Sequence, residues 1–249
     1  MSNASIMGRF FSNELFHFVG RSHPENHEAN FAVLKKILSS KCVSHPPHER
    51  GWSSTSIHIN WSENLSTEKL IVPNVVCFCD IPFEHLPMHL TKYGPFGLSL
   101  DKDGLTKFGT RPVTYIPLRA DDKGSPFGGQ LLKTFEQTYR GFREKLFDKA
   151  NLPATRISVH ASKPRTAGDA LSALDSVLAK DVLAFLKPFD SELADDDPRY
   201  YYAEREWRKL GNLMFEPADV HRVVVAPGFV ERLETEFPIF QGRIQSAPT

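Results

Sequence analysis

Hydrophobic residues recur with two different periods along the chain, and the period separates the expected helices from the expected strands. Residues 13–20, "NELFHFVG", form a short apolar run that ends in glycine, which predicts a buried strand and a turn. In residues 28–42 the apolar positions recur at helical spacing, which predicts a helix with one buried face. The chain is therefore expected to begin with a strand, a loop and a helix.

Residues 57–118 are rich in β-branched and aromatic residues and are broken by prolines, which is typical of strands and their ends. A turn is expected at "DKDG", residues 101–104. Asp80 ends one expected strand, and its most ordinary role is to cap a helix over "PFEHLPMHLTKY", residues 82–93. This part of the chain is therefore expected to be mostly sheet.

The period then changes to that of helices. Two apolar stripes step by three or four residues, one over 131–146 and the other through Leu171, Leu174, Leu178, Val182 and Leu186. They predict a helical block at about 127–188, inserted between two sheet-forming parts. The final segments predict two strands, "YYYAEREWRKL" and "HRVVVAP", and a closing helix, "GFVERLETEF". The expected fold is a single α+β domain over residues 1–249 with a mainly antiparallel sheet.

Charge and composition argue against several classes of protein. The 30 basic and 30 acidic residues cancel, which disfavours non-specific nucleic-acid binding. No run approaches the roughly 20 apolar residues of a membrane span, and the first residues lack the apolar segment of a secretion signal. The three cysteines are an odd number, which argues against a disulfide framework. We therefore expect a cytoplasmic protein with reduced thiols and no membrane contact.

The segment "VVCFCDIP" raises the question of zinc, since Cys77 and Cys79 are followed by His85 and His89. On a strand the two cysteines share one face with neighbouring apolar residues, which fits packing at least as well as ligation. The paired spacing of a structural zinc site is found only for the two histidines. No metal is therefore expected.

The charged segment 202–209, "YAEREWRK", is the strongest candidate for a functional strand. If it is extended, alternation places Glu204 and Glu206 on one face and Trp207 on the other, where the indole anchors the strand. Two carboxylates beside arginine could stabilise an oxocarbenium-like centre while they accept hydrogen bonds from a sugar hydroxyl. The alternative is a solvated edge strand whose charges form surface salt bridges.

Several blocks of the sequence resemble the AbiGi family of abortive phage-resistance proteins. They are "LFHFVG", "FCDIP", "HLTKYGPFGLSL", "PVTYI", "EREWR" and "VVVAPGF". This resemblance implies a role in phage defence, or the antitoxin half of a two-gene system with a toxin or a phage component as protein partner.

The order of these blocks is also similar, more distantly, to ADP-ribosyltransferases of the His-Tyr-Glu type. That similarity implies a sheet of the ADP-ribosyltransferase type and NAD as a substrate. In this scheme His17 binds the NAD ribose, Tyr93 stacks on the nicotinamide, and Glu206, supported by Glu204, stabilises the centre from which nicotinamide leaves. Phe78 stands at an aromatic position of the pattern but has no hydroxyl group.

Two functions therefore stay open from the sequence, while a third, nucleic-acid binding through a patch of Arg205, Arg208 and Lys209, is disfavoured by the zero net charge. One is cleavage of the NAD glycosidic bond for ADP-ribosyl transfer or hydrolysis, and the other is a non-enzymatic antitoxin or regulator with the same fold. Target choice is expected to lie in the loops 44–56 and 120–130, which carry no readable pattern.

Overall fold

The computed structural model describes residues 12–44, 55–118, 127–148, 167–194, 197 and 200–249. Its largest element is a seven-stranded sheet in the order β13-β12-β6-β1-β5-β10-β7. All neighbouring strands in it are antiparallel except β12 and β13, which are parallel. In chain order its strands are β1 (Glu14–Phe18), β5 (Val75–Cys79), β6 (Gly97–Asp101), β7 (Arg111–Pro112), β10 (Glu206–Leu210), β12 (Val220–Val225) and β13 (Ile244–Ser246).

Three small two-stranded sheets accompany the main one. They pair β2 (Cys42–Val43) with β11 (Leu213–Met214), β3 (Ile57–Ile59) with β4 (Ile71–Pro73), and β8 (Thr114–Pro117) with β9 (Leu186–Phe189). The helices are α1 (His27–Ser40), α2 (Pro87–Tyr93), α3 (Lys102–Lys107), α4 (Phe127–Asp148), α5 (Ala167–Val177) and α6 (Val230–Glu236). This confirms the α+β class and the mainly antiparallel sheet.

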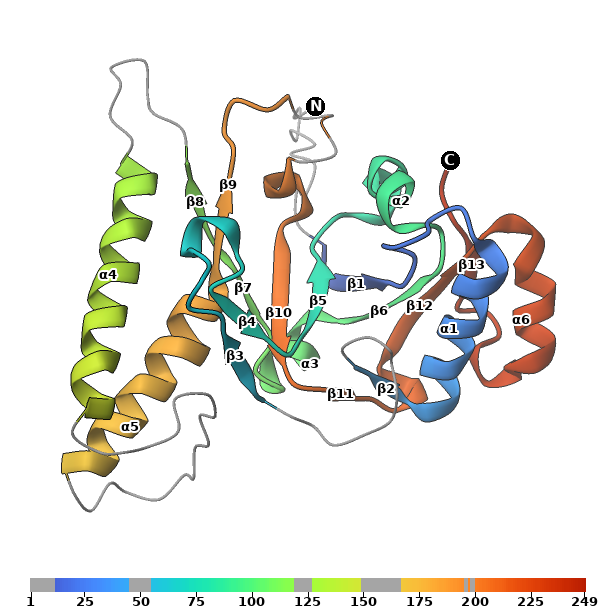
Figure 1. Ribbon diagram of the computed structural model, residues 1–249. Helices are drawn as coiled ribbons and strands as arrows, with labels where there is room; N and C mark the ends of the chain where they lie inside the picture. The colour runs from blue at the N-terminus through green and yellow to red at the C-terminus, as the bar shows by residue number, and fades with distance from the viewer. Residues whose placement is uncertain (1–11, 45–54, 119–126, 149–166, 195–196, 198–199) are drawn as a thin grey trace, which may run out of the picture.

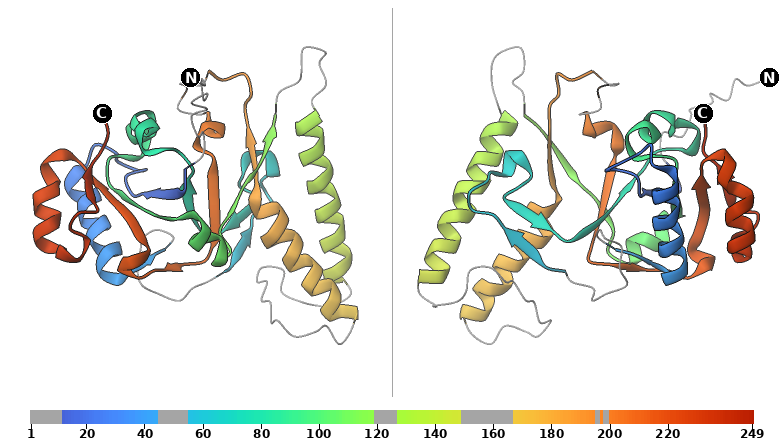
Figure 2. Two further views of the ribbon diagram at one scale, coloured as in Figure 1. Left: turned by 180° about the vertical axis from the view of Figure 1, so that it is seen from behind. Right: turned by 45° about the vertical axis from the view of Figure 1, so that its right-hand side comes forward.

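The helices gather at opposite ends of the sheet. Helices α1 and α6 lie at the β12–β13 end, whereas α4 and α5 lie beyond β10 with the small β8–β9 sheet, as the views agree (Figures 1 and 2). Helix α1 buries the apolar face that the sequence predicted, through Phe31, Leu34, Ile37 and Leu38. Helix α2 covers part of the sheet near β1 and β5, where Leu86 and Leu90 pack in one cluster with Phe16 and Cys79. No helix within the described residues is long and apolar enough to cross a membrane.

Some local predictions were wrong. Asp80 does not cap a helix, because its carboxylate accepts from the backbone N–H of Ser12 at 3.2 Å and from the ammonium of Lys102 at 2.5 Å. The segment 101–104 is not a turn but the start of α3, where the Asp101 carboxylate caps the helix by accepting from the Gly104 N–H at 2.7 Å.

The second helical stripe ends earlier than predicted. Helix α5 passes into a π-helical turn over Leu178–Val182 and a 3-10 turn over Leu183–Phe185, after which Leu186 begins strand β9. Most of the two loops expected to choose a target, 44–56 and 120–130, lies outside the described residues.

Candidate functional site

Strand β10 is an interior strand, and its two faces meet different surroundings. It lies between β5 and β7, with Glu206 opposite Cys79 and Trp207 opposite Phe78. Trp207 packs against the large core cluster that contains Phe78, so the tryptophan and Glu206 point to opposite faces, as predicted. The alternative of a solvated edge strand is excluded by this position in the sheet.

A corner at Arg205 separates the two glutamates. Tyr201–Glu204 is a 3-10 helix, and Arg205 follows it in the left-handed region with φ 45°. Glu204 therefore does not lie on the extended strand that the sequence predicted. The two carboxylates nevertheless converge, because both reach the ammonium group of Lys187 on β9. Glu206 Oε2 pairs with that group directly, and Glu204 Oε2 lies 3.8 Å from it.

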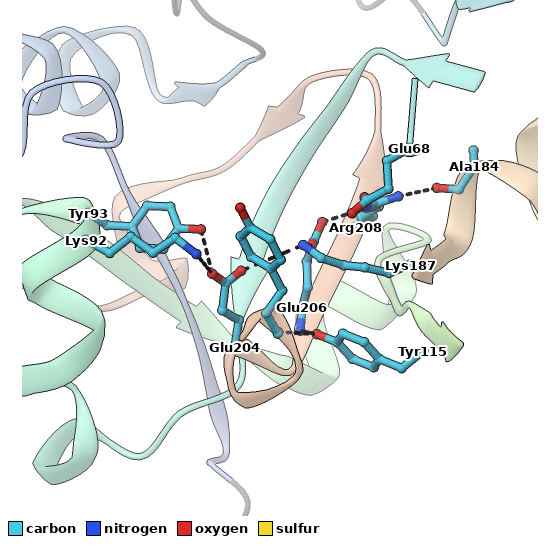
Figure 3. Close-up of polar contacts among 10 residues, drawn as sticks. Glu68, Lys92, Tyr93, Tyr115, Ala184, Lys187, Glu204, Glu206 and Arg208 are labelled. Carbon is cyan, nitrogen blue, oxygen red and sulfur yellow. Dashed lines mark hydrogen bonds and ion pairs between the residues drawn. The ribbon is translucent and has the colours of Figure 1, made fainter. Parts of the chain in front are cut away.

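The Glu206 carboxylate is buried and held by two cations. Oε2 accepts from Lys187, and Oε1 accepts from the Arg208 guanidinium at 2.6 Å (Figure 3). Burial alone would raise the pKa of Glu206, but the charges of Arg208 and Lys187 outweigh it and lower the pKa to about 2. The side chain is thus ionised at neutral pH, and it is enclosed by the protein, since only 5% of the residue is exposed.

Arg208 connects this carboxylate to two other parts of the chain. Its guanidinium donates to the carbonyl oxygen of Ala184, at 2.7 Å, and to the Glu68 carboxylate, at 3.1 Å. Ala184 belongs to the 3-10 turn before β9, and Glu68 follows the short 3-10 helix between β3 and β4. The network therefore ties strand β10 to the helical block and to the β3–β4 pair.

Glu204 forms the other half of the network, on the side of α2. Its Oε1 accepts from the hydroxyl of Tyr93 at 2.8 Å and from the ammonium of Lys92 at 2.5 Å (Figure 3). Burial, with the Glu204 charge beside it, raises the pKa of Tyr93, so the hydroxyl stays protonated and donates. Lys92 also lies over the ring of Tyr201, 3.8 Å from its centroid. Tyr93, predicted to touch nicotinamide, thus contacts a predicted catalytic residue.

His17 lies on the other face of the sheet. Phe16 pairs with Cys79, which pairs with Glu206, so these three share a face and His17, one residue on, points away from it. The His17 Nδ1 donates to the carbonyl of Cys77 at 2.9 Å, and its ring lies 5.8 Å from that of Phe78. The structure therefore brings Tyr93, Glu204 and Glu206 together. His17 lies on the opposite face of the sheet, and Phe78 is buried in the large core cluster.

A cavity of about 510 Å³ opens beside this network, between α2 and the segment that leads into β10. Its walls include Met88, His89 and Tyr202, and Lys92 and Glu204 also line it. Burial lowers the pKa of His89 to about 4, so this imidazole is neutral at pH 7. Glu206, Tyr93 and His17 are not among the residues that line the cavity. Its size suits a drug-sized molecule.

Several residues of the network were missed by sequence reasoning. The network depends on the ion pairs of Lys187, Lys92 and Glu68. Each of these is an ordinary charged residue in its own segment of the sequence. Lys187 had one usable signal, since it is a single charge within the apolar stretch "VLAFLKPF". Within the described residues, no group of three or more His, Cys, Asp or Glu side chains could hold a metal ion.

The fold and the site together define an α+β protein with a buried network of internally paired charges. A scan of protein families matched residues 56–229 to the family described as "Putative abortive phage resistance protein AbiGi, antitoxin". This match covers more than half of the chain, so the chain belongs to the AbiGi family. A search of curated proteins and a search of solved structures gave no match.

Proposed function

We propose that this protein is the antitoxin of a two-gene phage-defence system and acts by binding a protein toxin. The family is one of abortive phage resistance and its description carries the word antitoxin. The observation that carries the choice of binding over catalysis is the state of Glu206, whose two carboxylate oxygens are each engaged by a cation. A carboxylate held in this way is part of the framework of the fold and is poorly placed to accept a hydrogen bond from a sugar.

The test is protection of cells from the toxin. The probe is the product of the gene next to this one that stops growth when it is expressed alone. Co-expression of the wild-type chain should restore growth, and the two proteins should purify together. The variant Glu206→Gln, checked for folding by circular dichroism, should protect as well as the wild type because no chemical step depends on the carboxylate. A folded variant that no longer protects, or a wild-type chain that does not bind, would contradict the proposal.

A second candidate function is cleavage of NAD at the nicotinamide–ribose bond. It is supported by Glu204, which lines the 510 Å³ cavity and accepts a hydrogen bond from Tyr93. In this function Glu204 would face the substrate, whereas Glu206 and His17 would need to move before they could touch it.

Incubation of the purified protein with NAD, with release of nicotinamide as the readout, tests this candidate. If it holds, Glu204→Gln should lower the rate by at least about 100-fold, as loss of one electrostatic group does in other enzymes. Lys41→Gln is the control, because Lys41 forms an exposed pair with Glu216 away from the cavity. Absence of release by the wild type, alone and with cell lysate, would rule the candidate out.

A further inference from the structure

The cavity beside α2 has two walls that differ in chemistry. One is formed by α2 and the turn before it, which present His85, His89 and Lys92 at helical spacing. The other is formed by residues 200–205, which lead into β10. The volume of about 510 Å³ lies within the roughly 300–1,000 Å³ that is typical of small-molecule sites. The cavity can therefore hold a ligand of the size of a nucleoside.

The charges around the cavity cancel among themselves. Among the described residues, the lining charges are Asp80, Asp197, Glu204, Lys92 and Arg205. Lys102 pairs with Asp80 and supplies a third positive charge. Lys92 pairs with Glu204, and the remaining two lining charges have interaction partners as well. The site thus carries no net charge, and an uncharged ligand suits it better than a cation or an anion.

His89 offers the cavity a neutral imidazole. Burial lowers its pKa to about 4, so at pH 7 the ring carries one N–H donor and one nitrogen acceptor. Tyr93 stacks on this ring with 4.4 Å between centroids, and the ring of Phe18 lies 5.5 Å away, so packing holds the imidazole in place. Neither ring nitrogen has a hydrogen-bond partner among the residues that the structure describes. Both hydrogen bonds are therefore available to a ligand.

A carboxylate oxygen with spare hydrogen-bonding capacity lies near this imidazole. Oε1 of Glu204 accepts from Lys92 and from Tyr93 (Figure 3). Oε2 lies 3.8 Å from Lys187 and accepts no hydrogen bond from any described residue. The Glu204 charge raises the pKa of His89 against the effect of burial, so the two groups are neighbours. Together they match a ligand edge on which an amino group stands beside a ring nitrogen.

Tyr202 supplies an aromatic surface on the second wall. The residue lines the cavity and is 49% exposed, and its ring stacks on that of Phe189 at 5.0 Å with an interplanar angle of 26°. The ring of Tyr115 meets it edge to face at 5.1 Å. These contacts fix the plane of the Tyr202 ring before any ligand arrives. An exposed ring held in this way favours stacking by a flat heterocycle.

We propose that the cavity binds an uncharged planar heterocycle with an amino group beside a ring nitrogen, the base of an adenine-type nucleoside. The base stacks on Tyr202, its ring nitrogen accepts from the His89 N–H, and its amino group donates to Glu204 Oε2. The inference concerns binding alone, with no bond made or broken. It goes beyond the antitoxin function and depends neither on a toxin nor on cleavage of NAD.

Calorimetry with the full wild-type chain tests the recognition of the amino group without any variant. Adenosine should bind with a dissociation constant on the order of 0.1 mM, the affinity of a ligand of this size with ordinary efficiency. Purine riboside has the same ring system but lacks the amino group. It should bind about tenfold more weakly, because the Glu204 oxygen is then buried against the ligand without a donor.

Two substitutions test the two walls. Tyr202→Ala should weaken adenosine binding by about tenfold through the loss of stacking. His89→Phe keeps an aromatic ring against Tyr93 but removes both nitrogens, and it should weaken binding by about fivefold. The matched control is His58→Phe, because His58 is exposed on β3, away from the cavity. It should change the affinity by less than about twofold, and thermal melts show that each variant is folded.

The contrary outcomes are distinct from those of the proposed functions. Equal binding of adenosine and purine riboside would overturn the recognition of the amino group. No binding of adenosine at millimolar concentration would overturn the inference and leave the antitoxin function untouched. Binding of NAD without binding of adenosine would assign the cavity to the nicotinamide half of NAD and overturn the inference in favour of the second candidate function. Equal losses for His58→Phe and His89→Phe would place the ligand outside this cavity.

Discussion

Replacing Lys187 with methionine is expected to lower the free energy of unfolding by about 3 kcal/mol, the effect of removing one partner from a buried ion pair. The substitution keeps an unbranched chain of the same length up to Cε but removes the ammonium group and its charge. It takes one of two cations from Glu206 and leaves Glu204 with Lys92 alone. Because Glu206 is only 5% exposed and does not line the cavity, water cannot replace the lost ammonium beside its carboxylate. Urea unfolding at pH 7 measures the change.

The control is Lys41→Met, which breaks the exposed pair with Glu216 and should cost less than about 1 kcal/mol. The pH dependence gives an independent check. The folded-state pKa of Glu206 is about 2, below its ordinary 4.5, so its stabilising effect is complete above pH 4.5 and is lost as the pH falls towards 2. The difference between wild type and Lys187→Met should therefore shrink over that interval. Equal losses for the two variants at pH 7 would show that the network does not stabilise the fold.

Gly128→Ala is expected to destabilise the protein by about 3 kcal/mol, through a clash that the backbone cannot avoid. Gly128 is the second residue of α4, and a Cβ placed on it would lie 1.7 Å from the carbonyl oxygen of Pro117 on β8. No rotation of a side chain relieves this contact, because the obstructing atom belongs to the backbone. Helix α4 would have to move away from β8, and the packing of the helical block with it.

Gly141→Ala is the matched control, in the same helix. A Cβ on Gly141 would meet no atom within 4 Å, and alanine is the better helix former, so this change should stabilise by about 0.5–1 kcal/mol. Thermal unfolding of the two variants should shift the midpoint in opposite directions. A Gly128→Ala variant as stable as Gly141→Ala would mean that α4 and β8 do not approach as closely as the structure shows.

The elements that could be predicted from sequence are those whose pattern is decided locally. Helix α1 has four apolar residues on one face, and they are buried. Strand β10 alternates, so the opposed directions of Glu206 and Trp207 followed from the pleat alone. The short strands gave no such signal. The pairing of the two-residue strands β2 and β11 depends on packing between segments far apart in the chain, and so does the parallel pairing of β8 with β9.

The candidate site was predictable only in part, for the same reason. The sequence indicated the chemistry of Glu204 and Glu206, but not the residues that complete the network around them. Lys187 lies 19 residues from Glu206, and Glu68 lies 140 residues from Arg208, so no local pattern connects these pairs. The face on which His17 lies depends on the registers of β1, β5 and β10 together, which no single segment encodes. The left-handed backbone conformation of Arg205 could not be predicted either, since arginine has no preference for that conformation.

The order of strands in the main sheet also determines when the sheet can form during synthesis. Strand β1 is made first, yet it occupies the middle of the sheet, and its neighbours β5 and β6 emerge only about 60 and 80 residues later. The next strands outward, β10 and β12, lie more than 100 residues beyond those. Contacts between residues so distant in the chain slow folding, because the entropy cost of closing a long loop comes before the contact can stabilise the structure. The apolar strand β1 therefore leaves the ribosome well before the strands that pair with it, and its side chains stay uncovered until those strands are made.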